Sequence, residues 1–563
     1  MESTLMIILL FIPAAAALLM AVLPHKHTPR VVYELIHNIG MAAVCVLGNY
    51  LIFGVDTDGH TLYAFKPWFT IDALDCVFLF LICTVGFIVS VYAIPYIRDG
   101  YKKSELNSGQ FKTFYVFSSL FIFTMLIAVL TNNIIIMWVA IELTTLSTAF
   151  LVGLYMQRKP ALEAAWKYIF VCISGAGFGV FGVLLVYVNA ANVMPDTSMA
   201  LFWSELIPYA KSFDPLLMQI AFVFILIGFG TKAGLFPMNT WLPYAHSEAP
   251  APVSALLSGV LIKCAVLVIL RFFIVGMQVQ DNMDFVRIVL LVVGGLTMLI
   301  ATVCMFIQRD IKRLLAFSTC ENIGFIALCL GFGGPVGVIA VLPKCIFHGL
   351  TKSLMFCLSG NMTMKYGTRD LLKIKGLLTV APITGALMCM GFLALVCMPP
   401  FATFIEEIAM FIGGVQSNLI WVVVLVGLDL TIVLAVFIKV ITGSLMGEPT
   451  SEVADAEGSN EESSIQIKRG EPSKLAAVPL IVLMALIMWF GIAMPQSLSN
   501  SMSQAASILL QAETGELENV PFINDIFSSE TQDGNKAQYN SDDQKSFELE
   551  GAVSKISESG NTV

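Results

Sequence analysis

The chain has 563 residues, of which 57% are hydrophobic and only 13% are charged. Soluble domains carry about 25% charged residues, so this composition excludes an ordinary soluble protein and indicates a membrane protein. The net charge of -9 says little about the bundle, because 18 of the 40 acidic residues lie in two polar segments towards the C-terminus. We expect one helical bundle rather than several soluble domains.

The cysteines and histidines give no sign of a cofactor. The 12 cysteines are scattered singly through apolar stretches, without the two-residue spacing of a zinc or iron–sulfur site. We interpret them as small buried hydrophobic residues. His25, His27 and His60 lie in short polar loops, and no histidine pair is placed to hold a haem. Without a Walker loop or a dinucleotide fingerprint, the sequence predicts no metal, nucleotide or nucleic-acid partner, so its energy must come from an ion gradient or a partner protein.

The first apolar run, from Thr4 to Leu23, could be a signal peptide or a membrane helix. A signal peptide needs a positively charged region before its apolar core. Only Glu2 precedes this run, and no Lys or Arg does. We therefore interpret it as the first membrane helix.

Thirteen further apolar stretches follow it, each close to the roughly 20 residues that a spanning helix needs. The predicted fold class is therefore an all-α polytopic membrane protein with about 14 transmembrane helices. They lie near 4–23, 31–54, 71–97, 111–130, 133–156, 161–190, 216–236, 249–276, 285–307, 313–332, 335–360, 378–412, 417–443 and 475–498.

The basic residues in the loops test this count, because cytoplasmic loops are enriched in Lys and Arg. With the N-terminus outside, the outer loops before the C-terminal tail hold only Lys66 and Lys211. The bias predicts a cell-membrane protein with both termini on the outer face. The inner loops hold eighteen basic residues: Lys26, Arg30, Arg98, Lys102, Lys103, Lys112, Arg158, Lys159, Arg309, Lys312, Arg313, Lys365, Arg369, Lys373, Lys375, Lys468, Arg469 and Lys474.

Two polar segments lie outside the predicted helices. The acidic, Ser-rich stretch at 444–474 is expected to be a disordered cytoplasmic loop. Residues 499–563 form a polar tail, expected to be flexible apart from a short interfacial helix from Ser503 to Leu510.

Charged side chains occur within the predicted helices themselves. Arg271 and Arg287 lie near helix ends, where their heads can reach the interface. Each of the others costs about 2.5–3.5 kcal/mol at the bilayer centre, so together they must face one another or a wet interior. The acids are Glu142, Glu321, Glu406, Glu407 and Asp429, and the lysines are Lys167, Lys232, Lys263, Lys344, Lys352 and Lys439.

A chain of buried amines and carboxyls can relay protons. Burial and neighbouring charges act in opposite directions on the pKa of such groups, so each group's protonation can be switched by its neighbours. The alternative is a set of structural ion pairs that lock helices together, but a bundle does not need so many.

Helical spacing supports a relay in one helix. Lys344, His348 and Lys352 are four residues apart and therefore fall along one face. The imidazole titrates nearest to neutral pH, as a relay requires. Glu163 and Lys167 are also four apart, and an ordinary intrahelical ion pair is the simpler interpretation of those two.

Two of the predicted helices contain breaks. Pro237 follows a glycine-containing turn just after Lys232, and Pro399 and Pro400 precede Glu407. Proline removes a backbone donor, and such breaks at membrane depth are tolerated where they line a cavity. Paired broken helices are typical of transporters built from repeats.

Two inverted five-helix repeats are predicted, because helices four to eight match helices nine to thirteen in position and charge. Glu142 then corresponds to Glu321, Lys167 to the Lys344–Lys352 stripe, Lys232 to Glu407, and Lys263 to Lys439. The predicted segments are an N-terminal three-helix segment at 1–110, repeats at 111–276 and 285–443, the loop at 444–474, a last helix at 475–498 and the tail at 499–563.

At these residues the chain resembles the proton-pumping, antiporter-like subunits of complex I, group 4 membrane-bound hydrogenases and Mrp-type antiporters. The most specific stretch runs from Gly230 to Ala255 and reads GTKAGLFPMNTWLPYAHSEAPAPVSA, which includes His246. Supporting matches are WVAIE ending at Glu142, EAAWKY at 163–168, DIKRLLAFS at 310–318 and HGLTKS at 348–353. The resemblance covers about residues 70–443.

The resemblance implies roles for individual residues. Glu142 and Lys232 would be the coupled pair of the first half-channel, and Lys263 the central lysine. His348 and Lys352 would belong to the second half-channel, with Glu407 at its exit. Lys167 joins this proton-relay set, and His246, Glu321, Lys344 and Lys439 are further candidates. Some family members carry lysine where this chain has Glu407, so the pairing of half-channels stays open.

The subfamily is predicted from two stretches, Glu321–Gly324 and Glu163–Lys167, which look most like hydrogenase-type subunits such as those of formate hydrogenlyase. No long lateral helix follows the last span, unlike the distal complex I subunit. We therefore expect a non-redox, proton-translocating membrane subunit of a hydrogenase-like or complex I-like oxidoreductase. The alternatives are an Mrp-type Na+/H+ antiporter subunit without a redox partner, a bicarbonate-uptake subunit, and a structural scaffold.

Overall fold

Helices make up nearly all of the chain that a computed structural model describes, namely residues 2–58, 60–279, 282–448 and 469–511. Within those ranges, 13 helices are long and apolar enough to cross a membrane. This confirms the predicted all-helical polytopic class. The twelfth predicted span differs, since it consists of two shorter helices in series, α16 and α17. Most of the predicted acidic loop (449–468) and of the tail (512–563) lies outside the described residues.

Four helices of the N-terminal half begin at polar residues whose side chains bind free backbone N–H groups of the first turn. Asp72 and Asp75 form a reciprocal capping box at the start of α3, and Asn107 with Gln110 does the same for α4. The helices are α1 (Glu2–Val22), α2 (Arg30–Asp58), α3 (Ala73–Lys102), α4 (Ser108–Leu130), α5 (Ile134–Val152), α6 (Lys159–Val193), the short α7 (Trp203–Leu206) and α8 (Pro215–Ala233).

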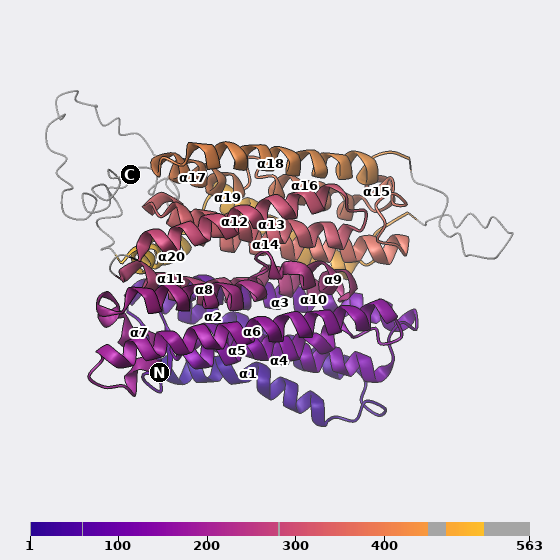
Figure 1. The fold of residues 1–563 in the computed structure, drawn as a ribbon. Coiled ribbons are helices and arrows are strands. Elements are labelled where there is room, and N and C mark those ends of the chain that lie inside the picture. Colours follow the sequence, from indigo (N-terminus) through magenta and orange to yellow (C-terminus); the bar gives the residue numbers. More distant parts are fainter. Residues whose placement is uncertain (1, 59, 280–281, 449–468, 512–563) are drawn as a thin grey trace, which may run out of the picture. The chain divides into compact units, whose positions relative to one another are not determined.

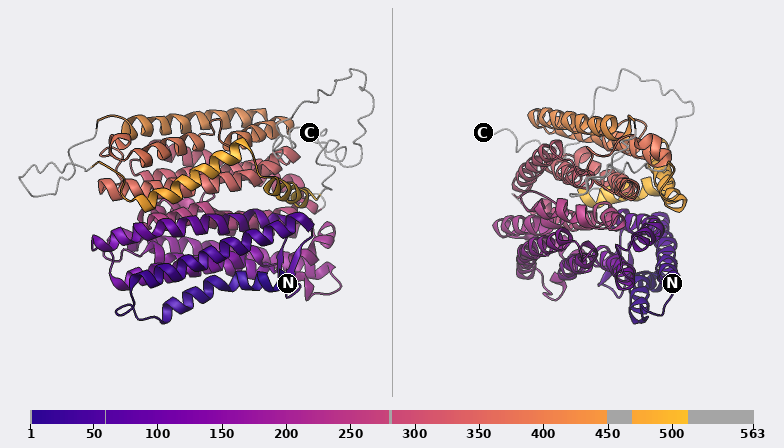
Figure 2. Two further views of the ribbon diagram at one scale, coloured as in Figure 1. Left: turned by 180° about the vertical axis from the view of Figure 1, so that it is seen from behind. Right: turned by 90° about the vertical axis from the view of Figure 1, so that its right-hand side faces the viewer.

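The later helices pack in series on this first set. They are α9 (Trp241–Glu248), α10 (Ala251–Leu256), α11 (Ile262–Gln278), α12 (Met283–Phe306), α13 (Ile311–Phe332), α14 (Pro335–Tyr366), α15 (Leu377–Val380), α16 (Pro382–Leu395), α17 (Thr403–Gln416), α18 (Ile420–Val440), α19 (Lys474–Ile492) and α20 (Gln496–Leu510). The predicted interfacial helix at 503–510 is therefore the second half of α20, which packs on α3 and α14. Figure 2 shows α19 running obliquely across the bundle, where it contacts α3, α14 and α16.

A short antiparallel hairpin joins α2 to α3 and was missed by the sequence analysis. Its strands are β1 (Leu62–Ala64) and β2 (Phe69–Ile71). Phe69 bridges to Thr131, and Asn133 bridges to Phe202. Segments predicted on the outer side are thus gathered at one end of the bundle. Helices that alternate in direction require this arrangement, although it does not decide which end faces outward.

Both predicted helix breaks are present. The helix α8 ends at Gly234, whose φ of 91° lies in the left-handed region that glycine adopts most easily, and a 3-10 turn leads into α9. The second break separates α16 from α17 and contains Pro399 and Pro400. Each break ends a helix close to a charged side chain.

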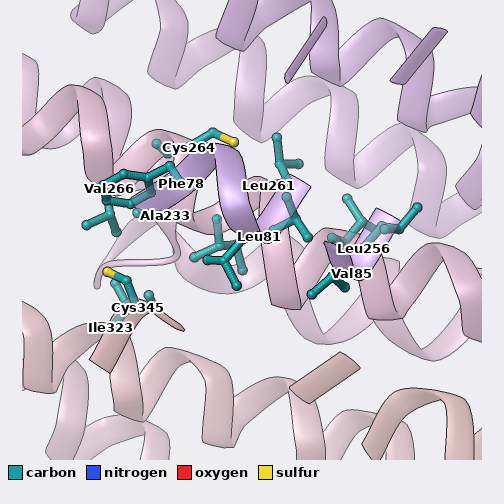
Figure 3. Close-up of a cluster of buried hydrophobic side chains, with 14 of the residues drawn as sticks. Phe78, Leu81, Val85, Ala233, Leu256, Leu261, Cys264, Val266, Ile323 and Cys345 are labelled. Atoms are coloured by element: carbon teal, nitrogen blue, oxygen red, sulfur yellow. The ribbon is translucent and has the colours of Figure 1, made fainter. Parts of the chain in front are cut away.

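The most enclosed helices lie at the centre of the bundle. Figure 1 shows α10 and α14 between α4–α6 on one side and α16–α18 on the other. A single π-helical turn, η4 (Leu257–Leu261), joins α10 to α11, and the apolar windows of 251–278 and of α14 are completely buried. Figure 3 shows side chains from α3, α8, α11, α13 and α14 interleaving here, among them Phe78, Cys264, Ile323 and Cys345. Cys264 and Cys345 directly follow Lys263 and Lys344, so apolar packing encloses the central amines.

The order of neighbour contacts recurs in the two predicted repeats. In the first, α4 packs on α5, α5 on α6 and α6 on α8. In the second, α12 packs on α13, α13 on α14, and α14 on both α16 and α17. The repeats and their boundaries stay predictions.

Candidate functional site: a file of buried amines and carboxyls

Lys232 lies in the last turn of α8, directly before the Gly234 break, and its side chain is buried. Its Nζ atom donates to Thr145 Oγ1 at 2.5 Å and to Tyr168 Oη at 2.9 Å. Tyr168 in turn hydrogen-bonds Thr148 at 2.6 Å. The amine therefore lies in a hydroxyl network that joins α5, α6 and α8.

Glu142 borders the same region from α5. A small cavity of about 10 Å³ is lined by Glu142, Lys232, Trp138 and Cys172, which is about the volume needed for one water. Glu142 is half-buried and lies within Coulombic range of Lys232, but the two make no ion pair within 4 Å. The predicted Glu–Lys couple is thus brought together around a water-sized space rather than through direct contact.

Glycines allow the helices around Lys232 to approach closely. A Cβ on Gly228 would collide with the backbone of Gly179, and one on Gly175 would collide with Thr231. The backbones of α6 and α8 are therefore in contact. This closeness places Tyr168 beside Lys232.

Lys263 lies in the first turn of α11, just after the π-helical turn. Its side chain is completely buried, and its Nζ atom lies 2.8 Å from the carbonyl oxygen of Ser258 and 2.6 Å from Nδ1 of His348. The π turn leaves the Ser258 carbonyl available to the lysine, and such turns are frequent at functional sites. Gly259, in the π turn before α11, and Gly349, on α14, allow these two segments to touch, since a Cβ on either glycine would meet the other segment.

The predicted stripe on α14 is buried throughout, because Lys344, His348 and Lys352 all lie in its enclosed middle. Each residue has a different partner. Lys344 lies with Nζ 4.1 Å from the centre of the Phe325 ring. Lys352 donates to the Leu315 carbonyl at 3.0 Å and to Ser318 Oγ at 2.6 Å. The stripe therefore connects α11 to α13.

Carboxyls lie on the far side of Lys344. Glu406, in the first turn of α17, is completely buried, and neither carboxyl oxygen has a hydrogen-bond partner. It lies within Coulombic range of Lys344. Glu407, which the sequence analysis chose, is only half-buried and lies beside Cys397. Adjacent helix positions are about 100° apart, so the two carboxyls point in different directions. Both lie within Coulombic range of Lys344, and Glu406 is the more deeply buried of the two.

We call the following buried and half-buried groups the file: Glu142, Lys232, Lys263, His348, Lys352, Lys344 and Glu406. Glu321 and Asp429 are two further carboxyls beside it. Glu321 on α13 is buried and accepts from the Asn322 amide at 2.5 Å. Asp429 on α18 accepts from Thr302 at 2.9 Å, while its other oxygen is without a partner. Both carboxyls lie within Coulombic range of each other. The candidate Glu321 is therefore inside the bundle and close to the main file.

Two predicted residues do not join the file. Lys167 is partly exposed, pairs with Glu163 at 2.6 Å and lies 4.1 Å from the Tyr244 ring centre, as the simpler interpretation expected. Lys439 is exposed at the outside of α18, 5.7 Å from the Phe306 ring centre. It does not occupy a place equivalent to Lys263. Both lysines were predicted to belong to the relay from their positions along a helix. The direction of each side chain depends on how its helix is rotated, and packing against neighbouring helices decides that rotation.

His246 on α9 is completely buried and stacks on Phe356 with ring centres 4.8 Å apart. Neither ring nitrogen has a hydrogen-bond partner. The sequence analysis also missed the burial of Lys312, which it counted as a loop charge. The available signal was Asp310, a helix-capping residue type that places Lys312 in the first turn of a helix.

The comparison with known proteins identifies the family of this chain. Residues 131–433 match the transmembrane family model described as NADH:quinone oxidoreductase/Mrp antiporter. The chain belongs to this family. The match includes the whole file from Glu142 to Glu406, so the two broken helices and the central amines lie within the family's shared region.

Relatives in the family come from several complexes. The chain is 34% identical over 404 residues to the hydrogenase-4 component F homolog of Methylacidiphilum infernorum, covering 72% of this chain and 83% of that protein. It is 29% identical to hydrogenase-4 component B of Escherichia coli, covering 60% and 49% respectively.

Two solved structures share the fold. One belongs to the membrane-bound sulfane sulfur reductase, an archaeal respiratory membrane complex, with a TM-score of 0.77, 21% identity and coverage of 92% and 99%. The other belongs to the Mrp complex from Dietzia, with a TM-score of 0.76, 20% identity and coverage of 94% and 99%. The chain is therefore an antiporter-like membrane subunit whose structural relatives work in multisubunit membrane complexes.

Proposed function

We propose that this chain relays protons across the membrane as a subunit of a hydrogenase-type or complex I-like respiratory complex. The single observation that carries the proposal is the contact between Lys263 and His348, whose nitrogens lie 2.6 Å apart in the completely enclosed centre. Two positive charges at this separation would repel by about 6 kcal/mol at an effective dielectric constant of about 20. The pair is therefore expected to hold one proton between two nitrogens.

The file continues in both directions from this pair. On one side, Lys232 and Glu142 lie around a water-sized cavity. On the other, Lys344 leads to Glu406. Proton transfer needs groups linked directly or through one water. The Lys263–His348 contact is direct, and the cavity beside Lys232 and Glu142 has room for one water.

The partners of the buried lysines argue against a purely structural role. Within the described residues, Lys232, Lys263, Lys344 and Lys352 make no ion pair within 4 Å. A lysine that only locks helices together would be expected to bind a carboxylate, because an unpaired charge is costly at this depth. Lys232, Lys263 and Lys352 instead bind hydroxyls, carbonyls and an imidazole, which tolerate a change in protonation. Lys344 lies against the Phe325 ring.

The same chemistry favours protons over sodium as the transported ion. Sodium is bound by oxygen ligands, as other hard cations are. The centre of the file consists of amines and an imidazole, which repel a metal cation when protonated and are poor ligands for it. Sodium/proton exchange without a redox partner is the competing proposal.

The partner assignment rests on the resemblance to hydrogenase-4 components, and the orientation on the positive-inside bias. We propose that both termini face outward in the cell membrane. We also propose that Glu142, Lys232, Lys263, His348, Lys352 and Lys344 carry the relay together with Glu406, while Lys167, Lys439 and Glu407 are outside it.

Proton flux through the reconstituted complex tests this function. The complex would be purified with its native partners, placed in liposomes containing a pH-sensitive dye, and driven by a potassium diffusion potential. We expect Lys232→Ala to reduce proton uptake by about tenfold or more. Lys167→Ala, the matched surface lysine, should stay within about twofold of the unmodified complex.

Normal proton uptake in Lys232→Ala would overturn the proposal. Uptake that required sodium on the opposite side of the membrane would favour the antiporter alternative.

A further inference from the structure

A hollow of about 530 Å³ opens at the end of the bundle that the charge bias predicts to be the inner end. The ends of α3, α9 and α14, the start of α13 and the segment between α5 and α6 line it. Its walls carry both signs of charge, from Asp99, Glu105, Arg158, Glu248, Lys312 and Arg369. It is the kind of polar surface from which a buried relay could collect protons.

Lys312 occupies the inner wall of this hollow. Only 4% of it is exposed, and its Nζ atom donates to the Ala249 carbonyl at 2.8 Å. Within the described part of the chain no carboxylate lies within 4 Å of this amine. Lys312 is thus a buried amine without an ion pair, like the lysines of the central file.

An ion-pair cluster holds the walls around Lys312 in place. Arg369 pairs with Glu248 at 2.9 Å and with Asp310 at 3.3 Å, and it also donates to the Ser247 carbonyl. Asp310 accepts from the backbone N–H of Lys312 at 2.8 Å. These carboxylates are therefore committed to Arg369 and to the helix terminus, and the Lys312 amine is left facing the hollow.

Lys312 and the central Lys352 have one helix, α13, and one neighbouring histidine in common. Lys352 binds Leu315 and Ser318 on the same helix, and six residues of helix rise only about 9 Å. His246 lies within Coulombic range of both Lys312 and Lys352. Its two ring nitrogens are buried without hydrogen-bond partners. Such burial lowers the stability of the fold, which favours a role for the imidazole other than packing.

We propose that Lys312 is the inlet group of the relay, which takes protons from the inner hollow and passes them through His246 to Lys352. This inference rests on the proposed function. In each cycle a proton from water binds the neutral Lys312 amine and moves to one nitrogen of His246. The imidazole then releases a proton to the Lys352 amine, and Lys352 passes it on to the central groups of the relay. No electrons are exchanged, and the Lys352 amine is neutral again before the next proton arrives.

The competing explanation is that Lys312 only anchors α13 to the end of α9 through Ala249. The substitution Lys312→Arg separates the two roles. Arginine keeps the positive charge and the donor groups, but it does not release its proton in a protein. Lys103, which lies at the rim and pairs with Asp99 at 2.8 Å, supplies the matched control Lys103→Arg.

The variants would be measured in the reconstituted complex described above. We expect Lys312→Arg to assemble and to reduce proton uptake by about tenfold or more, while Lys103→Arg stays within about twofold. Uptake in Lys312→Arg that equals the control would overturn the inlet. If Lys232→Ala also left uptake unchanged, the proposed function would fail and the inlet with it, whereas loss in Lys232→Ala alone would reject only the inlet.

A labelling experiment decides the matter even where Lys312→Arg does not assemble. Thr368→Cys places a thiol in the hollow, and a membrane-impermeant methanethiosulfonate reagent would modify it. We expect proton transport to fall when the reagent is applied from the inner face and to persist when it is applied from the outer face, compared with the unmodified chain treated in the same way. Full transport after complete modification from the inner face would overturn the proposal.

Discussion

Nζ of Lys263 lies 2.6 Å from Nδ1 of His348, at the contact between the two predicted repeats. Glycines on both helices permit the approach, and the π-helical turn before Lys263 gives the amine a second partner at Ser258. Three further lysines within the enclosed helices, Lys232, Lys344 and Lys352, have separate partners of their own. The contact therefore joins α11, in the first predicted repeat, to α14, in the second.

Removing this imidazole should interrupt the file. We expect His348→Gln to reduce proton flux by about 10- to 100-fold, because the amide keeps polar contacts but cannot carry a proton. His37 supplies the control, since it is also a buried histidine but lies on α2, bonded to Ser119 at 2.7 Å. His37→Gln should leave the flux within about twofold of the unmodified complex. Equal effects of the two substitutions would show that His348 is only a packing residue.

The two adjacent glutamates on α17 should differ in effect. Glu406 is completely buried without partners, whereas Glu407 is half-buried beside Cys397. We expect Glu406→Gln to reduce proton flux by about tenfold or more and Glu407→Gln to have a much smaller effect. Flux measurements on the two isosteric variants in the same liposomes check this, and a larger loss in Glu407→Gln would restore the interpretation made from sequence.

The contact between α6 and α8 should be sensitive to a single methyl group. A Cβ on Gly228 would collide with the Gly179 backbone, whereas one on Gly177 would meet nothing within 4 Å. We expect Gly228→Ala to lower the free energy of unfolding by about 1–3 kcal/mol through overpacking. Gly177→Ala on the same pair of helices should be neutral or slightly stabilising. Thermal denaturation of the purified complex measures both, and equal midpoints would contradict the close contact.

Arg271 should fasten α11 to the start of α3. Its guanidinium pairs with Asp72 at 2.7 Å and with Asp75 at 2.6 Å in a buried cluster. Arg271→Met leaves two carboxylates without their partner, which should cost about 3–5 kcal/mol of stability. Neutralising the acids as well, in the triple variant with Asp72→Asn and Asp75→Asn, should recover part of that loss. No recovery would mean that Arg271 acts mainly through its packing on Trp203.

Helix identity and the main breaks could be predicted from the sequence, because both are local properties. Long apolar runs predicted the spans, and Pro237 with its glycines and the Pro399–Pro400 pair predicted the two interruptions. The four-residue spacing of Lys344, His348 and Lys352 predicted a shared face, which depends only on helix geometry. The hairpin at 62–71 was missed, since its strands are three residues each and carry little periodic signal.

Which charged groups meet was decided only by the tertiary structure. Helix rotation and tilt depend on packing against neighbours, and no local pattern specifies them. Packing buried Glu406 more deeply than Glu407, left Lys439 outside and buried Lys312 beneath the ends of three other helices. The sequence by itself therefore determined that costly charges lie at membrane depth. The packed bundle determined which of them lie close to one another, because the proposed proton exchange depends on distances of a few ångströms between separate helices.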